Sequence, residues 1–324
     1  LPAAERARNP AKAPDLRVCF VLGFYFAKMQ AYKGMECRKR TAFLFQSMRK
    51  AKCLTQLFKI EREVKSMLKN EIERYLATRS GKVAVVWRDL ISGEEFSIAG
   101  KTRFVSASTI KLLIMAELLD QIAAGRRSLS DHILLTQAWV TGGDGILKEL
   151  RPGHSFALEE ILTLMIIVSD NTATNLLIDL LEMDAINEQA KKLGLRETQL
   201  GRKMMDTEAK RQGRENYICA EDMAKMLELI YRGTLVDEKM SRTALEILLR
   251  QQQTGRLQLY LPEETPVAHK CGDLDCLEHD GGLILVEGHP YLLVVLTEQN
   301  QSNREGRETI GAISKMVYDA MLAR

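Results

Sequence analysis

The sequence lacks several features that would indicate particular functions. It has no run of about 18 consecutive apolar residues, the length that a helix needs to cross a bilayer. It also lacks internal repeats, a phosphate-binding glycine loop and a nucleotide-binding fingerprint, and none of its five histidines stands at metal-ligand spacing. We therefore expect no membrane-spanning helix, no metal and no cofactor.

Cysteine is scarce and unevenly placed. Three of the six cysteines fall within residues 1–59, and the other three are Cys219, Cys271 and Cys276. No spacing matches a zinc site, and an odd number beyond residue 59 argues against a complete disulfide framework. We expect buried or incidental thiols, which give no indication of a cellular compartment.

Charge divides the chain into two parts. The 324 residues carry a net charge of +3, but residues 1–59 contain 13 Lys and Arg against 3 Asp and Glu, and the remainder contains 33 against 40. The mildly acidic remainder gives no reason to expect nucleic-acid binding. Residues 1–59 combine charge with about ten apolar residues, as a secretory signal does, but no small-x-small cleavage site follows. We interpret 1–59 as a basic extension, disordered or not a domain, and 60–324 as the functional domain.

Hydrophobic periodicity in residues 60–324 predicts an α+β fold. Apolar residues at helical spacing predict a helix at 57–78, and two strand-like segments joined by a tight turn then predict a hairpin at 81–100. Helical patterns fill 108–250, after which three strands and a last helix follow. We therefore expect a five-stranded antiparallel sheet, flanked by the two terminal helices, as a lobe of residues 60–107 and 251–324. Residues 108–250 would form an inserted all-helical lobe.

The pattern Ser-x-x-Lys occurs at Ser47, Ser66 and Ser108, and only the last stands where a strand meets an apolar helix. Residues three apart share a helix face, so the amine of Lys111 could reach the Ser108 hydroxyl. Lysine opposes the helix dipole in a first turn, which would lower its pKa and favour a base. Alternatively, Ser108 or a neighbour caps the helix, although a capping box would place Glu or Gln, not Lys, at the third position.

Two further motifs are weak in isolation. Ser169-Asp170-Asn171 lies between two helical segments, where such residues commonly cap and turn the chain. Lys270-Cys271-Gly272 ends a predicted strand. In order and spacing, however, the three motifs match the set found in penicillin-recognising serine enzymes. Residues from about 60 to 324 resemble a class A β-lactamase domain, most specifically in "SDNTATNLLID" and in "HKCG" near "HDGGLI".

The resemblance implies a role for each motif residue. Ser108 would attack the β-lactam carbonyl, Lys111 would act as base or proton relay, and Ser169 would pass a proton to the departing nitrogen. Asn171 would bind the amide of the substrate side chain. The segment Lys270, Cys271, Gly272 and Asp273 would bind the substrate carboxylate and supply, with the Ser108 N–H, the oxyanion hole.

The sequence departs from this family at two positions. Cys271 replaces a hydroxyl residue and is a weaker donor, which should cost roughly 1 kcal/mol of binding. Aligning "TQL" with the start of the family's Ω loop places Met204 where a glutamate would activate the deacylating water. Asp206 or Glu208 could substitute, or could be solvated charges or partners of Arg202 or Arg214. The sequence thus supports acylation better than fast deacylation.

Three functions remain open. The first is a serine hydrolase of class A β-lactamase type with slow deacylation. The second is a peptidase, transpeptidase or esterase that acts on a peptidoglycan-like peptide or small ester, and the third is a penicillin sensor that stays acylated. All use Ser108. We expect a monomer. The family resemblance favours an extracytoplasmic location, secreted or periplasmic, and the sequence leaves a cytoplasmic location open.

Overall fold

The sheet is five-stranded and antiparallel throughout, as predicted. The computed structural model describes residues 66–323, so the predicted extension 1–59 lies outside the described residues. The strand order is β2-β1-β9-β8-β7, which leaves β7 at one edge. The strands are β1 (Lys82–Asp89), β2 (Glu95–Ile98), β7 (Val267–Leu274), β8 (Leu277–Ile284) and β9 (Tyr291–Glu298).

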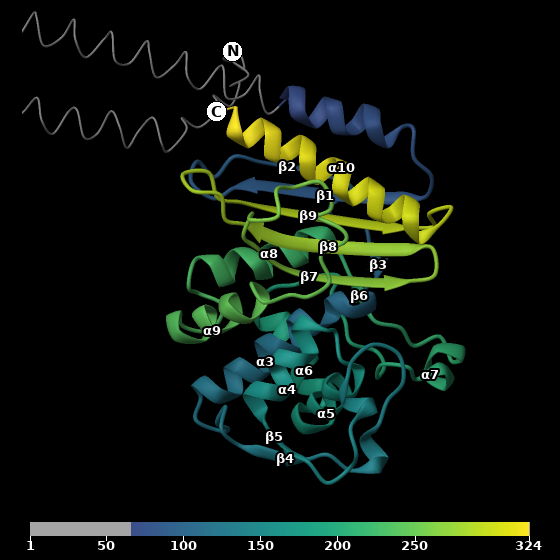
Figure 1. Ribbon diagram of the computed structural model, residues 1–324, viewed down its shortest axis with the longest axis vertical. Helices are drawn as coiled ribbons and strands as arrows, with labels where there is room; N and C mark the ends of the chain where they lie inside the picture. Colours follow the sequence, from purple (N-terminus) through teal and green to yellow (C-terminus); the bar gives the residue numbers. More distant parts are fainter. Residues whose placement is uncertain (1–65, 324) are drawn as a thin grey trace, which may run out of the picture. The chain divides into compact units, whose positions relative to one another are not determined.

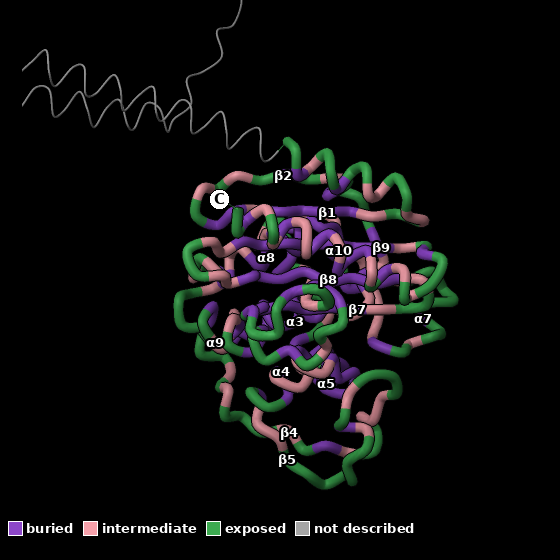
Figure 2. Tube along the Cα trace, turned by 45° about the horizontal axis from the view of Figure 1, so that its top comes forward, coloured by how far each residue is buried: buried purple, intermediate pink, exposed green. Residues whose placement is uncertain are grey.

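The terminal helices cover one face of the sheet. Residues 66–76, which belong to the predicted helix 57–78, and α10 (Asn303–Leu322) pack on strand residues that alternate toward them (Figure 1). Their shared core includes Ile72, Trp87, Val295 and Ile313. Residues of the opposite parity, such as Val86 and Val294, belong to the core on the other face. Both faces are therefore buried, and Figure 2 shows the central strands buried along most of their length.

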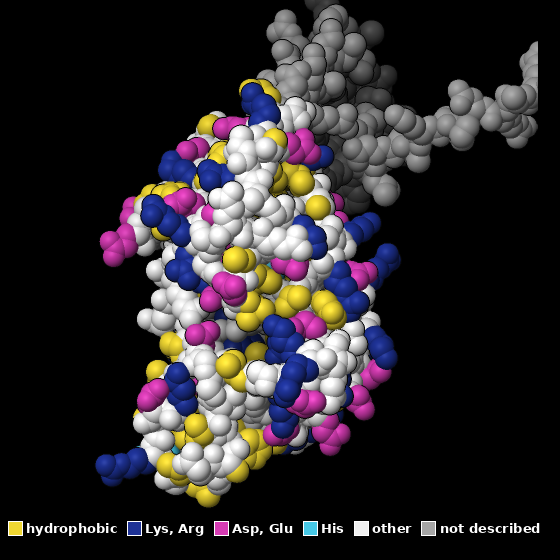
Figure 3. Space-filling model, turned by 90° about the vertical axis from the view of Figure 1, so that its right-hand side faces the viewer, with side chains coloured by type: hydrophobic (Ala, Val, Ile, Leu, Met, Phe, Trp, Pro, Cys, Tyr) yellow, Lys and Arg dark blue, Asp and Glu magenta, His cyan; other side chains and the backbone are white. Residues whose placement is uncertain are grey.

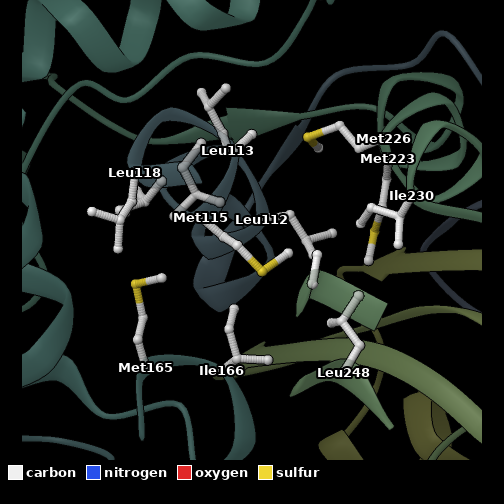
Figure 4. Packing of buried hydrophobic residues seen from close by; sticks show 14 of the residues in the cluster. Leu112, Leu113, Met115, Leu118, Met165, Ile166, Met223, Met226, Ile230 and Leu248 are labelled. Atoms are coloured by element: carbon white, nitrogen blue, oxygen red, sulfur yellow. The ribbon is translucent and has the colours of Figure 1, made fainter. Parts of the chain in front are cut away.

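The helical lobe is organised around α3, of whose thirteen residues ten are buried. A helix that is apolar on most sides must be surrounded by other elements. Figure 4 shows Leu112, Met115 and Leu118 among side chains from neighbouring helices. The lobe contains α3 (Lys111–Ala123), α4 (Leu158–Ile167), α5 (Asn171–Leu181), α6 (Met183–Lys192), α7 (Thr207–Arg211), α8 (Ala220–Tyr231) and α9 (Glu238–Leu248).

Two short pairs of strands escaped the sequence prediction. β3 (Phe104–Val105) pairs with β6 (Tyr217–Ile218), and β4 (His132–Leu134) pairs with β5 (Ser155–Ala157). β3 lies shortly before Ser108. Its pairing with β6 therefore joins the Ser108 segment to the end of the segment 198–217, which begins with the sequence "TQL". Segments of two or three residues are too short to show an alternating pattern.

Residues 66–323 contain neither a membrane-spanning helix nor a cluster of metal-binding side chains. No helix there is both long and apolar enough to cross a membrane. The same residues contain no group of three or more His, Cys, Asp and Glu side chains that could hold a metal ion.

Candidate active site

Ser108 lies in the 3₁₀ turn η1 (Ala107–Ile110), which joins β3 to α3. Its predecessor Ala107 has φ +46°, a left-handed conformation that costs a non-glycine residue energy. The alternative reading of Ser108 as a helix cap is wrong. The capping positions of η1 and α3 are Ser106 and Ile110, and neither makes a side-chain capping bond.

Lys111 is completely buried at the start of α3. Its amine donates hydrogen bonds to the Ser169 carbonyl at 2.7 Å, the Ser169 hydroxyl at 3.3 Å and Asn171 Oδ1 at 2.9 Å. Burial, reinforced by the nearby charge of Lys270, holds the pKa of Lys111 well below its ordinary value. Among the described residues the amine makes no hydrogen bond to Ser108, which the sequence placed within its possible reach, and it is held instead by Ser169 and Asn171.

Ser169 lies between the two buried lysines. Its hydroxyl accepts from Lys111 and also from Lys270 Nζ, at 2.9 Å. Its φ of +57° is a second left-handed backbone conformation at the site. The neighbouring Asp170 caps α5 by accepting from Ala173 N at 2.9 Å. The motif therefore is a cap and turn, and it also presents the Ser169 hydroxyl to two lysines.

Lys270 reaches this centre from the edge strand β7. It is completely buried, and burial lowers the pKa of its amine, although the neighbouring Cys271 and Asp280 act in the opposite direction. The glycine that follows is sterically required. A Cβ at Gly272 would lie 2.6 Å from Ser108 N and 3.0 Å from Thr109 N. The backbone of β7 thus passes directly beside η1, and this contact brings Lys270 and Ser108 to one site.

The Cys271 thiol is enclosed by the protein and contacts Gln253. It is completely buried, and Sγ lies 3.0 Å from Gln253 Oε1. Burial also raises the pKa of the thiol, which disfavours the reactive thiolate. Cys271 therefore supports the position of Gln253 and is unsuited to be a nucleophile in this state.

This burial predicts selective alkylation. N-Ethylmaleimide should label the partly exposed Cys276 at least about ten times faster than Cys271 in the folded protein, because thiolate formation and access both limit the reaction. Peptide mapping by mass spectrometry measures both rates. Labelling in urea provides the control, since the two cysteines should then react at similar rates. Equal rates in the native protein would contradict the structure.

Ser108 opens into a cavity of about 360 Å³, within the size range of small-molecule sites. Asn171, Met204, Met205 and Asp206 line it beside Ser108. Figure 3 faces the side of the molecule on which α7 lies and shows hydrophobic side chains gathered across its middle, with charged side chains around them. The cavity thus offers both apolar and polar surface.

The loop before α7 presents Met204 to this cavity. The Asn175 amide fixes its backbone, with Met204 N donating to Asn175 Oδ1 at 2.8 Å and Asn175 Nδ2 donating to Met204 O at 3.1 Å. The side chain is largely buried, at 9% exposure. Sequence reasoning overlooked Asn175, although its position four residues after Asn171 places both on one face of α5.

The two alternative carboxylates have other partners. Asp206 lines the cavity, but its Oδ1 accepts from Ala209 N at 2.8 Å and caps α7. Glu208 is exposed, pairs with Arg211 at 2.5 Å and does not line the cavity. Glu208 is thus a solvated charge, one of the two readings that the sequence left open, and its arginine partner is Arg211 rather than Arg202 or Arg214.

Asp273 and Arg256 form an ion pair beside the site that the sequence did not reveal. Arg256 is 4% exposed and bonds Asp273 at 2.5 Å and Glu278 at 2.5 Å. Arg256 precedes β7 by eleven residues in irregular chain, where no spacing indicates its direction. Its two carboxylate partners neutralise a cation that would otherwise be buried alone.

Comparison with known proteins gives a consistent family. The model of the beta-lactamase enzyme family matches residues 67–321. A beta-lactamase of Bacteroides uniformis is 24% identical over 277 residues, which cover 79% of this chain and 92% of that protein.

Two solved structures share the fold. The beta-lactamase from Sphaerobacter thermophilus is 31% identical with a TM-score of 0.73, over 80% of this chain and 98% of that chain. A mutant of PBP-A in an acyl-enzyme complex with penicillin G is 26% identical with a TM-score of 0.73, over 80% of this chain and 97% of that chain. Since the family model spans most of the sequence and the fold agrees, the chain belongs to the beta-lactamase enzyme family.

Proposed function

We propose that the protein is a serine hydrolase that opens β-lactams through an acyl-enzyme on Ser108 and releases the product slowly. In the first step the Ser108 oxygen bonds to the lactam carbonyl carbon, and the carbon–nitrogen bond of the ring then breaks. The observation that carries this proposal is the Ser169 hydroxyl held between two buried lysines, one of which follows Ser108 by three residues.

The proton of Ser108 needs a route to the departing nitrogen. Lys111 suits the role of acceptor because burial favours its neutral amine, and a small rotation would exchange an acceptor on α5 for the Ser108 hydroxyl. Ser169 would relay the proton to the lactam nitrogen, while Lys270 orients its hydroxyl. One proton thus leaves Ser108 and one arrives at nitrogen.

Substrate binding would use both walls of the site. The side-chain amide of Asn171 lines the cavity and would bond the acyl amide of the substrate. Lys270 would attract the substrate carboxylate, with Cys271 holding Gln253 beside it. The backbone N–H groups of Ser108 and Asp273 would stabilise the oxyanion, because Gly272 lets their two segments approach closely.

Deacylation is the step for which the site is poorly equipped. Met204 occupies the loop position fixed by Asn175, and a thioether cannot take a proton from water. Of the two carboxylates that the sequence offered as substitutes, Asp206 is committed to capping and Glu208 lies outside the cavity. Methionine in place of a base at position 204 also favours a second candidate. This is an enzyme or sensor whose acyl group is not released to water, and an enzyme of this kind would transfer it to another acceptor, such as the amine of a peptidoglycan-like peptide.

Mass spectrometry of the intact full chain tests the proposal. Mixed with benzylpenicillin, the protein should gain the mass of one penicillin within minutes, and the adduct should decay more slowly than it forms. A chromogenic cephalosporin measures turnover in parallel, and Ser108→Ala should remove both signals. If the protein forms no adduct and shows no turnover, the proposal is wrong. An adduct that never decays would instead select the second candidate.

We also propose that the protein works as a monomer outside the cytoplasm. The support is the family resemblance. Light scattering and cell fractionation would test the two statements separately.

A further inference from the structure

A second cavity adjoins the one that contains Ser108. It measures about 330 Å³, and Gln253, Arg256 and Arg307 contribute to its walls. Two carboxylates, Asp144 and Asp273, line both cavities. A molecule that extends from Ser108 into the second cavity must therefore pass beside these two side chains.

The charges of the second cavity are paired, with one exception. Arg256 bonds Asp273 and Glu278, and Arg307 bonds Glu278 at 2.9 Å. The exposed carboxylate of Asp144 has neither an ion pair nor a hydrogen bond to any side chain or backbone group within residues 66–323. Its charge acts on the buried amines of Lys111 and Lys270, but no direct partner within residues 66–323 holds it at the junction between the cavities.

The backbone holds Asp144 firmly in this place. Its carbonyl accepts from Asn171 N at 3.0 Å, and the Asp170 carboxylate accepts from Ile146 N at 2.7 Å. Gly145 has φ +111°, and a Cβ there would collide with the Asp170 carboxyl group. The loop is thus fixed by the same α5 start that binds Lys111, and Asp144 cannot easily leave the site.

The two cavities correspond to two ends of the substrate. Asn171 lines only the cavity with Ser108, whereas Gln253 and Arg256 line only the second. If Asn171 binds the acyl side chain, the fused ring and its substituents extend from Ser108 toward Asp144 and the second cavity. This assignment rests on the proposed function.

We propose that Asp144 is a specificity-determining residue that selects substrates with a positive charge where the substrate passes from the Ser108 cavity into the second cavity. The substrate class is zwitterionic: a carboxylate near Lys270 and a cationic group beside Asp144. Cephalosporins with a cationic substituent at the 3′ position have this arrangement, and so would a peptide with an ammonium group in the leaving portion.

Two cephalosporins with the same 7-thienylacetyl group test the proposal. One carries a neutral acetoxymethyl group at position 3 and the other a pyridiniomethyl group, and stopped-flow or intact-mass measurements give the second-order acylation rate of each. We expect Asp144→Asn to lower the ratio of cationic to neutral rates about threefold, as an exposed ion pair would. Asp144→Lys should lower it further, to about a tenth. The ratio cancels any effect of Asp144 on Lys111 or Lys270, since both compounds need those lysines equally.

Glu149→Gln is the matched control, because Glu149 is an exposed carboxylate near Asp144 in sequence but lines neither cavity. A ratio that falls in the Asp144 variants and stays constant in Glu149→Gln supports the proposal. If adducts form but Asp144→Asn leaves the ratio unchanged, the proposal is wrong. It is also wrong if Glu149→Gln changes the ratio as much as Asp144→Asn does. Absence of any adduct with either compound would overturn the proposed function, and this inference with it.

Discussion

Met204→Glu should shorten the life of the penicillin adduct about a hundredfold while leaving its rate of formation within a few-fold of the wild type. The Asn175 amide hydrogen-bonds both the N–H and the carbonyl of residue 204, so the loop should keep its path when the side chain changes. Glutamate is close to methionine in length, and its carboxylate would enter the cavity that Ser108 opens into. A positioned general base contributes typically 10²–10⁴-fold to a proton-transfer step.

The decisive measurement separates acylation from deacylation. Intact mass after a single pulse of benzylpenicillin gives the decay of the adduct, and the initial rise gives its formation. Met204→Gln is the matched control, because it has the shape and polarity of glutamate without a basic carboxylate. If Gln accelerates decay as much as Glu does, the gain comes from water access rather than from a base. If neither does, residue 204 does not face the ester.

Lys111→Ala should slow acylation by about 10²- to 10⁴-fold, the usual contribution of a general base. The amine is completely buried between α3 and the start of α5, and among residues 66–323 it is the lysine nearest to Ser108 in the chain. Lys111→Arg gives the sharper comparison, since guanidinium keeps the positive charge but stays protonated. If the charge alone mattered, Arg would restore acylation, whereas we expect it to remain slow. Thermal unfolding of both variants monitors the fold.

The pH profile gives Lys111 a second, independent signature. Burial and the charge of Lys270 lower the pKa of Lys111, so its neutral form is present at lower pH than that of an ordinary lysine. Acylation by the wild type should therefore be constant above this lowered pKa and should fall as the pH decreases through it. Lys111→Ala should lose that limb of the profile. A variant that retained both the limb and the rate would assign the base to another group.

The sequence predicted the fold because each main element carries a pattern of its own. Continuous apolar residues within Lys82–Asp89 and within Tyr291–Glu298 are typical of strands that are covered on both faces. The motif residues around Ser108 and Ser169 were identified by order and local context. Their mutual distances, however, depend on where β7 passes η1, and only the structure gives that contact.

The features that escaped prediction depend on tertiary contacts rather than on local pattern. Asn175 resembles any polar residue on a helix until the loop with Met204 folds over it. Arg256 acquires its meaning from Asp273 and Glu278, which lie on two different strands. Asp144 lies in an irregular segment whose course is set by Asp170. In each case the partner is distant in the chain, so no spacing could indicate it.

The bond between Asn175 and the backbone of Met204 has a consequence for how this protein could change over time. Because both hydrogen bonds join Asn175 to backbone atoms of residue 204, they do not depend on the side chain there. The loop should therefore keep its conformation when residue 204 is substituted. The methionine codon differs from a glutamate codon only in its first and second bases, and the intermediate codons encode valine or lysine. A lineage that began with a long-lived adduct would thus lie a short mutational path from rapid antibiotic breakdown, with the scaffold for the new base already in place.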